Sequence, residues 1–231
     1  MTTFVLVPGA WGGAWMWEPV TRELTAAGHT VHAVTLPGLH AHGSEERSSI
    51  TLDDHVAYVR GLLDEIGETG VVLAGHSYAG IVAGLVAAAE PERVGHTVFV
   101  DANVPVDGHS MIDGWSPEGR AHVTAAIEAN GGLWPVLSAE DLDGQDFDDA
   151  RLALFLGRSL PHPGRTIFGV AKPERPLTEL SATYINCTLN GEDPNPAAAP
   201  YRDVWRFVEL RTGHWPMLTK PKELAAILRA V

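Results

Sequence analysis

Residues 71–80 read Val-Val-Leu-Ala-Gly-His-Ser-Tyr-Ala-Gly and carry the strongest structural signal in the sequence. Their apolar start predicts a buried strand, and the small apolar residues beyond Ser77 predict a helix. A serine held in so sharp a strand-to-helix turn projects its hydroxyl above the sheet, which requires tiny neighbours two residues away on either side. Gly75 meets that requirement, and Ala79, followed by Gly80, adds one methyl at the second position. We therefore predict Ser77 as a nucleophile; the alternative is a serine N-cap on an ordinary strand–helix turn.

Strand-like and helix-like segments alternate along most of the chain. Short runs with strand character occur at residues 4–7, 30–36, 71–76, 97–101, 183–189 and 206–211. Helical periodicity over residues 53–66 comes with a candidate N-cap, Thr51, and a candidate stop, Gly67, and a second helix is expected behind Pro221. This alternation predicts an α/β fold in which a mostly parallel sheet is flanked by helices.

The alternation breaks between about residues 103 and 182, where helical pieces, acidic residues and turn signals occur without a convincing strand. The chain length favours one domain over two. We expect a single domain spanning residues 1–231, with residues 103–182 as an inserted helical cap. Ligands bind at the carboxyl edge of open α/β sheets, so a cap there would roof the pocket. The alternative is an insertion with a structural role alone.

The amino-acid composition disfavours several classes of binding partner. With 29 acidic against 16 basic side chains, the net charge of −13 disfavours nucleic acid and anionic membrane surfaces. The longest apolar stretch, residues 80–89, is well below the roughly 20 residues that cross a bilayer. No basic segment precedes the first apolar run and no clear cleavage site follows it, so we expect a cytoplasmic protein. The only cysteine, Cys187, lies in a strand-like run and is expected to be a buried structural thiol.

Residues 8–15 read Pro-Gly-Ala-Trp-Gly-Gly-Ala-Trp and directly follow the first predicted strand. Acyl transfer needs N–H donors for an oxyanion, commonly one from such a loop and one from the residue after the nucleophile. We therefore predict the backbone N–H groups of Ala10 and Tyr78 as the oxyanion hole. The glycine spacing is not G-x-G-x-x-G, which disfavours a dinucleotide site.

The general base of such a fold is expected on a loop after the last strand, and residues 210–217, Leu-Arg-Thr-Gly-His-Trp-Pro-Met, predict His214 for that role. His40 and His42 form an H-x-H pair with no third ligand, so no metal is predicted. His76 is expected to pack. The remaining histidines outside the insertion are expected at element edges or on helix surfaces: His29, His32, His55 and His96.

Several motifs follow one another in a familiar order over nearly the whole chain. They are Val-Pro-Gly-Ala-Trp-Gly-Gly-Ala-Trp, Gly-His-Ser-Tyr-Ala-Gly, Val-Asp-Ala-Asn-Val-Pro, Tyr-Ile-Asn-Cys-Thr and Gly-His-Trp-Pro-Met-Leu-Thr-Lys-Pro. In these motifs the chain resembles the branch of the α/β-hydrolase superfamily that holds plant methyl esterases, hydroxynitrile lyases and their bacterial esterase relatives. The resemblance implies a Ser-His-Asp triad and cleavage of small esters without a cofactor.

The triad acid is the point of departure from that family. In the plant relatives the acid follows Cys-Thr by two residues, and this chain has Asn190 there, an amide without the charge that stabilises an imidazolium. Asp101 ends a predicted strand, a place from which some α/β-hydrolases supply their acid. Asp193 lies in the loop after Asn190. We favour Asp101, and Asp193 stays open.

The leading functional hypothesis is a serine esterase or lactonase that forms an acyl-enzyme with a small apolar or aromatic ester. A hydroxynitrile lyase of the family has a threonine in the oxyanion loop and a lysine after the histidine, where this chain has Gly9, Ala10 and Trp215. Asn190 keeps open a tailoring enzyme, such as a cyclase, or a non-catalytic ligand-binding protein.

The side chains of Trp11, Tyr78 and Trp215 adjoin the proposed catalytic residues and are the predicted substrate contacts. We expect a small-molecule ester as the partner and no cofactor, and a homodimer remains open.

Overall fold

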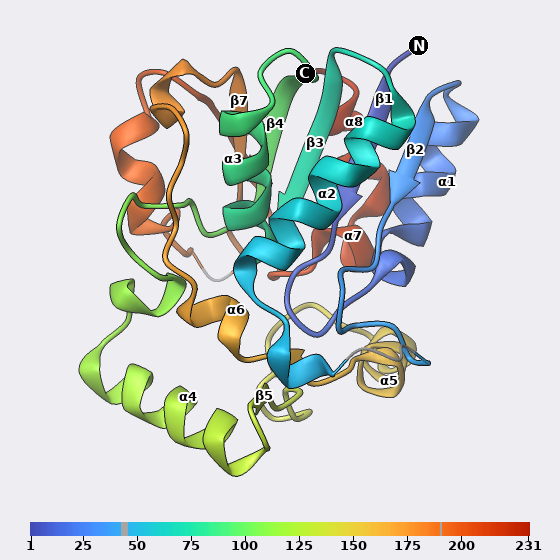
Figure 1. The fold of residues 1–231 in the computed structure, drawn as a ribbon. Coiled ribbons are helices and arrows are strands. Elements are labelled where there is room, and N and C mark those ends of the chain that lie inside the picture. Colours follow the sequence, from blue (N-terminus) through green and yellow to red (C-terminus); the bar gives the residue numbers. More distant parts are fainter. Residues whose placement is uncertain (43–45, 190) are drawn as a thin grey trace.

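The computed structural model describes residues 1–42, 46–189 and 191–231. Its centre is a six-stranded, all-parallel sheet in the order β2-β1-β3-β4-β7-β8 (Figure 1). These strands are β1 (Thr3–Val7), β2 (Thr30–Ala33), β3 (Val71–His76), β4 (Val94–Val100), β7 (Ala182–Cys187) and β8 (Arg206–Leu210). The predicted fold class is confirmed, although β2 ends three residues before the predicted boundary at Leu36.

The strand order reverses between β1 and β3, because the chain builds β2 on one side of β1 and then crosses to the other side. Such a reversal opens a crevice at the carboxyl ends of the two strands, where α/β proteins bind ligands. The loop after β1 contains Ala10, and the turn after β3 contains Ser77. The topology therefore brings the predicted oxyanion loop and the predicted nucleophile to the same crevice.

Both faces of the sheet are covered, which explains why the central strands are continuous apolar runs instead of alternating ones. Every residue of β1 and β3 is buried. Along β3, Val71 and Leu73 join one core cluster, whereas Val72 and Ala74 join the cluster on the opposite face.

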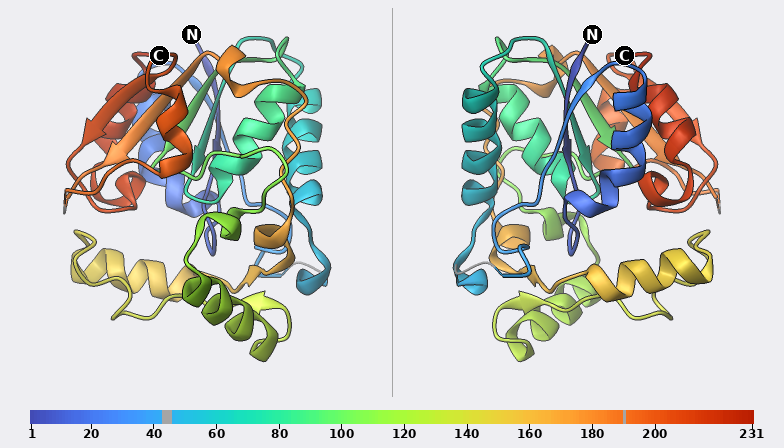
Figure 2. Two further views of the ribbon diagram at one scale, coloured as in Figure 1. Left: turned by 90° about the vertical axis from the view of Figure 1, so that its left-hand side faces the viewer. Right: turned by 90° about the vertical axis from the view of Figure 1, so that its right-hand side faces the viewer.

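Helices α2 (Leu52–Ile66) and α3 (Ala79–Ala89) cover one face, and α1 (Glu18–Ala26) and α8 (Pro221–Leu228) cover the other (Figure 2). The predicted boundaries of α2 are confirmed. Thr51 caps its first turn by accepting a hydrogen bond from the Asp54 backbone N–H, and Gly67 ends it with a φ of 69°.

The chain between β4 and β7, residues 103–181, is called the cap segment below. Its helices α4 (Pro117–Ala129), α5 (Asp149–Arg158) and α6 (Arg165–Phe168) lie beyond the carboxyl ends of the strands, at the opposite end from the two termini (Figure 2). Against the expectation of no strand here, β5 (Leu133–Trp134) and β6 (His162–Pro163) form an antiparallel pair. Two residues are too few to produce a recognisable alternation.

The remaining helices are short. They are α7 (Pro216–Thr219) and the 3-10 turns at Ala14–Trp17, Arg47–Ser49, Met111–Gly114, Leu177–Glu179 and Pro196–Tyr201. In the parts of the chain that the structure describes, no helix has the length and apolar character needed to cross a membrane.

Candidate active site

Ser77 sits in the turn between β3 and α3 with a φ of 53°, a conformation that costs a non-glycine residue energy. The turn is so tight that a Cβ on Gly75 would lie 2.3 Å from the Ala79 carbonyl oxygen. A Cβ on Gly80 would lie 2.3 Å from the carbonyl oxygen of Asn103. Both glycines are therefore required by close backbone approach, and Ala79 is tolerated because the second crowded position is Gly80.

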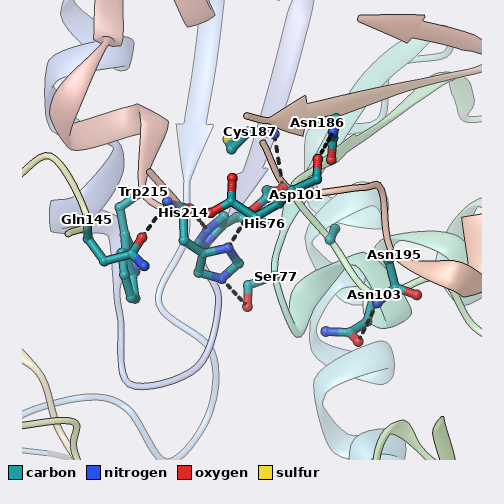
Figure 3. A network of polar contacts seen from close by, with 12 residues as sticks. His76, Ser77, Asp101, Asn103, Gln145, Asn186, Cys187, Asn195, His214 and Trp215 are labelled. Atoms are coloured by element: carbon teal, nitrogen blue, oxygen red, sulfur yellow. Dashed lines mark hydrogen bonds and ion pairs between the residues drawn. The ribbon is translucent and has the colours of Figure 1, made fainter. Parts of the chain in front are cut away.

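His214 connects the serine to a carboxylate. It lies between β8 and α7, and its Nε2 is 2.9 Å from Ser77 Oγ (Figure 3). Its Nδ1 is 2.5 Å from Asp101 Oδ2. The side chains of His214 and Asp101 are 31% and 20% exposed, so the pair is partly desolvated yet reachable by a substrate. The three side chains that the sequence predicted as a triad are thus brought into one chain of contacts.

Asp101 directly follows β4 and, like Ser77, has a positive φ, 46°. Its second oxygen, Oδ1, accepts a hydrogen bond of 3.0 Å from the Cys187 backbone N–H at the end of β7. This contact fixes the carboxylate so that Oδ2 faces His214. The other candidate, Asp193, is exposed and lines a surface groove with Arg202 instead. Asn190, which stands at the family's usual position of the acid, lies outside the described residues.

His76 was expected only to pack, but in the structure it also forms a hydrogen bond to the loop that contains His214. It is buried, and its Nε2 donates a 2.7 Å hydrogen bond to the backbone carbonyl of His214. The carbonyl can only accept, so the neutral ring carries its proton on Nε2. Burial, together with the nearby His214, holds the pKa of His76 well below its usual range. The residue before the nucleophile therefore anchors the loop of the proposed base.

The predicted oxyanion loop, residues 8–15, packs closely against the turn that contains Ser77. A Cβ on Gly9 would lie 2.8 Å from both His76 Nδ1 and Ser77 Cβ, so only glycine fits there. In the described part of the chain, no protein group accepts a hydrogen bond from the backbone N–H of Ala10 or Tyr78. Neither predicted donor is therefore used by another protein group.

The side chain of Tyr78 faces the protein interior. It is fully buried, and its hydroxyl lies 2.9 Å from His55 Nδ1. The Nε2 of His55 donates to the Pro37 carbonyl at 2.9 Å, so Nδ1 must accept from the tyrosine. Substrate contact through the Tyr78 side chain stays a prediction, but the ring has no exposed surface. The arrangement favours a role for Tyr78 through its backbone N–H.

His55 was expected at an element edge or on a helix surface, and this prediction is wrong. The side chain is 0% exposed, because His55 shares the inward face of α2 with Val59 and Leu63. Burial lowers its pKa to about 4. A second buried histidine, His162 of the cap segment, packs against Tyr78 with ring centroids 4.8 Å apart.

The two other predicted substrate contacts, Trp11 and Trp215, border the site and are 7% and 5% exposed. Trp11 packs on Trp134 of the cap segment, with ring centroids 4.3 Å apart. Trp215 packs on Phe155, with ring centroids 5.1 Å apart. Both tryptophans therefore join the cap segment to the loops of the site.

The structure also bears on Cys187 and on the pair His40 and His42. Cys187 is buried, and burial together with the nearby Asp101 carboxylate raises the pKa of its thiol, which disfavours a nucleophilic role. His40 and His42 are exposed. No cluster of metal-ligating side chains occurs within the described ranges.

A serine hydroxyl beside an imidazole, an imidazole beside a fixed carboxylate, and two N–H groups without a protein acceptor are the parts needed for acyl transfer. The comparisons agree with this geometry. Residues 4–227 match the Alpha/beta hydrolase family, and the chain belongs to that family.

Two curated relatives cover almost the full chain. The carbendazim hydrolyzing esterase of Nocardioides sp. is 29% identical over 258 residues and covers 100% of both chains. Methylesterase 7 of Arabidopsis thaliana is 38% identical and covers 97% of this chain and 94% of its own. The resemblance to plant methyl esterases and bacterial esterases is thereby confirmed.

Among solved structures, an extracellular alpha/beta-hydrolase from a Paenibacillus species superposes with a TM-score of 0.88 at 24% identity. The match covers 100% of this chain and 98% of the other. That protein is described as sharing structural and functional homology with tobacco salicylic acid binding protein 2. At this level of identity the likeness shows the fold.

Proposed function

We propose that the protein is a serine hydrolase that cleaves a small, apolar or aromatic carboxylic ester or lactone through an acyl-enzyme on Ser77. The observation that carries the proposal is the unbroken contact chain Asp101–His214–Ser77, at 2.5 Å and 2.9 Å. The esterase and methylesterase relatives support the same reaction class.

The proposed cycle has two steps. Ser77 Oγ attacks the carbonyl carbon while its proton passes to His214 Nε2, and the oxyanion is bound by the N–H groups of Ala10 and Tyr78. The leaving alcohol takes the proton from Nε2, which leaves the acyl group on Oγ. A water molecule then gives its proton to Nε2 and attacks the acyl carbon, and the acid departs as Oγ regains the proton. Asp101 stabilises the imidazolium in both steps.

The alternatives from the sequence are less well supported by this geometry. A non-catalytic binding protein was kept open by Asn190, but Asp101 offers the missing carboxylate. A small ester as the partner, the absence of nucleic-acid and membrane partners, the absence of a cofactor, a homodimer and a cytoplasmic location stay predictions of the sequence.

The test follows p-nitrophenol release from p-nitrophenyl acetate and butyrate, from the first milliseconds. The wild-type protein should show an initial burst of up to one equivalent if deacylation is slow, and Ser77→Ala should abolish turnover. The matched control is Ser49→Ala, an exposed serine on the turn Arg47–Ser49. Ester hydrolysis that persists in Ser77→Ala, or is absent in the wild type, would contradict the proposal.

A further inference from the structure

Asn103 lies beside the proposed nucleophile without belonging to the triad. Its backbone N–H donates a 3.0 Å hydrogen bond to the Ser77 carbonyl. Its own carbonyl approaches α3 at Gly80, where no side chain would fit. Two backbone contacts therefore fix the position of Asn103 relative to the nucleophile.

The orientation of the Asn103 amide follows from its partners. Asn195 Oδ1 accepts a 2.9 Å hydrogen bond from the Ala197 backbone N–H, so Asn195 presents its Nδ2 on the other side. That Nδ2 donates to Asn103 Oδ1 at 3.0 Å, which identifies the remaining atom of the Asn103 amide as Nδ2. In the described part of the chain, no protein group accepts a hydrogen bond from Asn103 Nδ2. Two N–H donors on a rigidly held amide are thus available to a ligand.

Asn103 and Asn195 line a cavity of about 340 Å³. Most of its wall is apolar and comes from α3, the cap segment and the stretch after β4: Ile81, Val104, Met111, Trp115 and Ala171. The exposed carboxylate of Asp113 also lines it, and hydrogen bonds from Ser110 lower the pKa of that carboxyl. His109 lines the cavity as well, so a mostly apolar wall carries one carboxylate and one imidazole, which suits an uncharged, mostly apolar group.

The two sides of the nucleophile are not equivalent. His214 Nε2 must protonate the leaving oxygen, so the alcohol part of the ester faces His214. Asn103 lies on the other side of Ser77 from His214 (Figure 3). The side of Ser77 away from His214 is therefore left for the acyl part, and Asn103 lies on that side and lines the cavity.

We propose that this cavity binds the acyl part of the substrate, and that the Asn103 amide selects acyl groups that carry an uncharged hydrogen-bond acceptor, such as a ketone or ether oxygen. The inference rests on the proposed ester hydrolysis and adds the substrate class to it. Asn195 is a positioning residue, because its hydrogen bond to Oδ1 fixes the orientation of the Asn103 amide.

The test compares kcat/KM for two pairs of p-nitrophenyl esters with the same leaving group: 4-oxopentanoate against pentanoate, and 5-oxohexanoate against hexanoate. The ratio of oxo ester to plain ester removes effects on the shared chemistry. In Asn103→Leu, which has a similar volume but no donor, the ratio should fall about three- to tenfold for at least one pair, as expected for one neutral hydrogen bond. Asn195→Ala should lower the same ratio less, because the amide can still rotate into place.

Met111→Leu is the matched control, since it changes the cavity wall without a polar atom, and it should alter both esters of a pair by the same factor. Asn195→Ala keeps the test decisive if Asn103→Leu fails to fold by circular dichroism. Unchanged ratios in the folded Asn variants, with Ser77-dependent hydrolysis of both esters, would overturn the acyl-site inference alone. No Ser77-dependent hydrolysis of any ester would overturn the proposed function and this inference with it.

Discussion

The carboxyl ends of the central strands, called the sheet edge below, and the cap segment position their residues in different ways. Ser77 directly follows the buried strand β3, Asp101 follows the buried last four residues of β4, and both have a positive φ, 53° and 46°. Such strained conformations persist only where the surrounding structure fixes them. In the cap segment, α4 buries only Val123 and Ile127, and α5 buries only Phe155. The proposed reacting groups are thus positioned by the sheet, whereas most of the surface of these two helices faces away from the core.

Three hydrogen bonds illustrate how the cap segment is attached. Gln145 Oε1 accepts from the His214 backbone N–H at 2.8 Å, and the Leu160 N–H donates to the Trp11 carbonyl at 3.0 Å. Arg151 Nε donates to the Leu218 carbonyl at 2.7 Å. All three end on the loops or the short helix around the site and none on a strand. Changes at the sheet edge should therefore cost chemistry or folding, and changes in the cap segment should cost less.

The largest effect is expected for Asp101→Asn. The amide retains the shape of the carboxylate but loses the charge that stabilises the His214 imidazolium, so kcat should fall by about 10⁴-fold. The measurement is steady-state hydrolysis of p-nitrophenyl butyrate, with the free energy of unfolding from urea titration as a check that the fold is retained.

Asp193→Asn is the matched control, because it removes the other candidate carboxylate from an exposed loop. It should leave kcat within about twofold of the wild type. The reverse result, loss of activity only in Asp193→Asn, would assign the acid to a loop beyond β7. It would also contradict the conclusion that the sheet edge positions the proposed triad.

The second-largest effect is expected from acid, which should lower the free energy of unfolding through the buried histidines. His55 has a pKa lowered to about 4 by burial, and burial lowers the pKa of His76 and His162 in the same direction. The unfolded chain binds protons with a histidine pKa of about 6.5, so these groups contribute full stability above pH 6.5 and lose it as pH falls from 6.5 toward the folded pKa. For His55 the loss at pH 5.5 is about 1.4 kcal/mol, and the lowered pKa values of His76 and His162 add to it in the same direction.

Urea unfolding at pH 7.5 and pH 5.5 measures this difference. His55→Gln should lower the overall stability but reduce the pH-dependent loss by about 1.4 kcal/mol, because one buried titrating group is removed. Equal unfolding free energies at the two pH values in the wild-type protein would show that these histidines are protonated alike in the folded and unfolded chains.

Much of this site could be predicted because its signals are local. The strand, glycine, serine and helix around Ser77 are consecutive, and His214 follows the last strand. Gln145 and His76 were missed because their contacts with the His214 backbone span 69 and 138 positions, and no spacing pattern reports such partners. His55 was missed despite a signal, since residues 52, 55, 59 and 63 repeat at helical spacing. A polar residue within that pattern indicated burial with a partner.

The smallest effect concerns the single side-chain hydrogen bond between the cap segment and the loop of the proposed base. Gln145→Ala leaves the His214 backbone N–H without its acceptor, while the hydrogen bond from His76 still holds the carbonyl of the same residue. We expect kcat/KM for p-nitrophenyl butyrate to fall about two- to tenfold, which corresponds to one hydrogen bond. The free energy of unfolding should change by less than about 1 kcal/mol, because Gln145 is only partly buried.

Gln145→Glu separates this bond from the general packing of the cap segment, because a carboxylate can accept from the same N–H. Its activity should exceed that of Gln145→Ala when both are measured at pH 7.5. If Gln145→Ala is as active as the wild type, the sheet edge alone positions His214. The cap segment then contributes less to the position of His214 than its hydrogen bond indicates. If the alanine variant loses more than about a hundredfold, the cap segment positions the base as strongly as the sheet does, and the contrast fails, because one neutral hydrogen bond does not account for so large a loss.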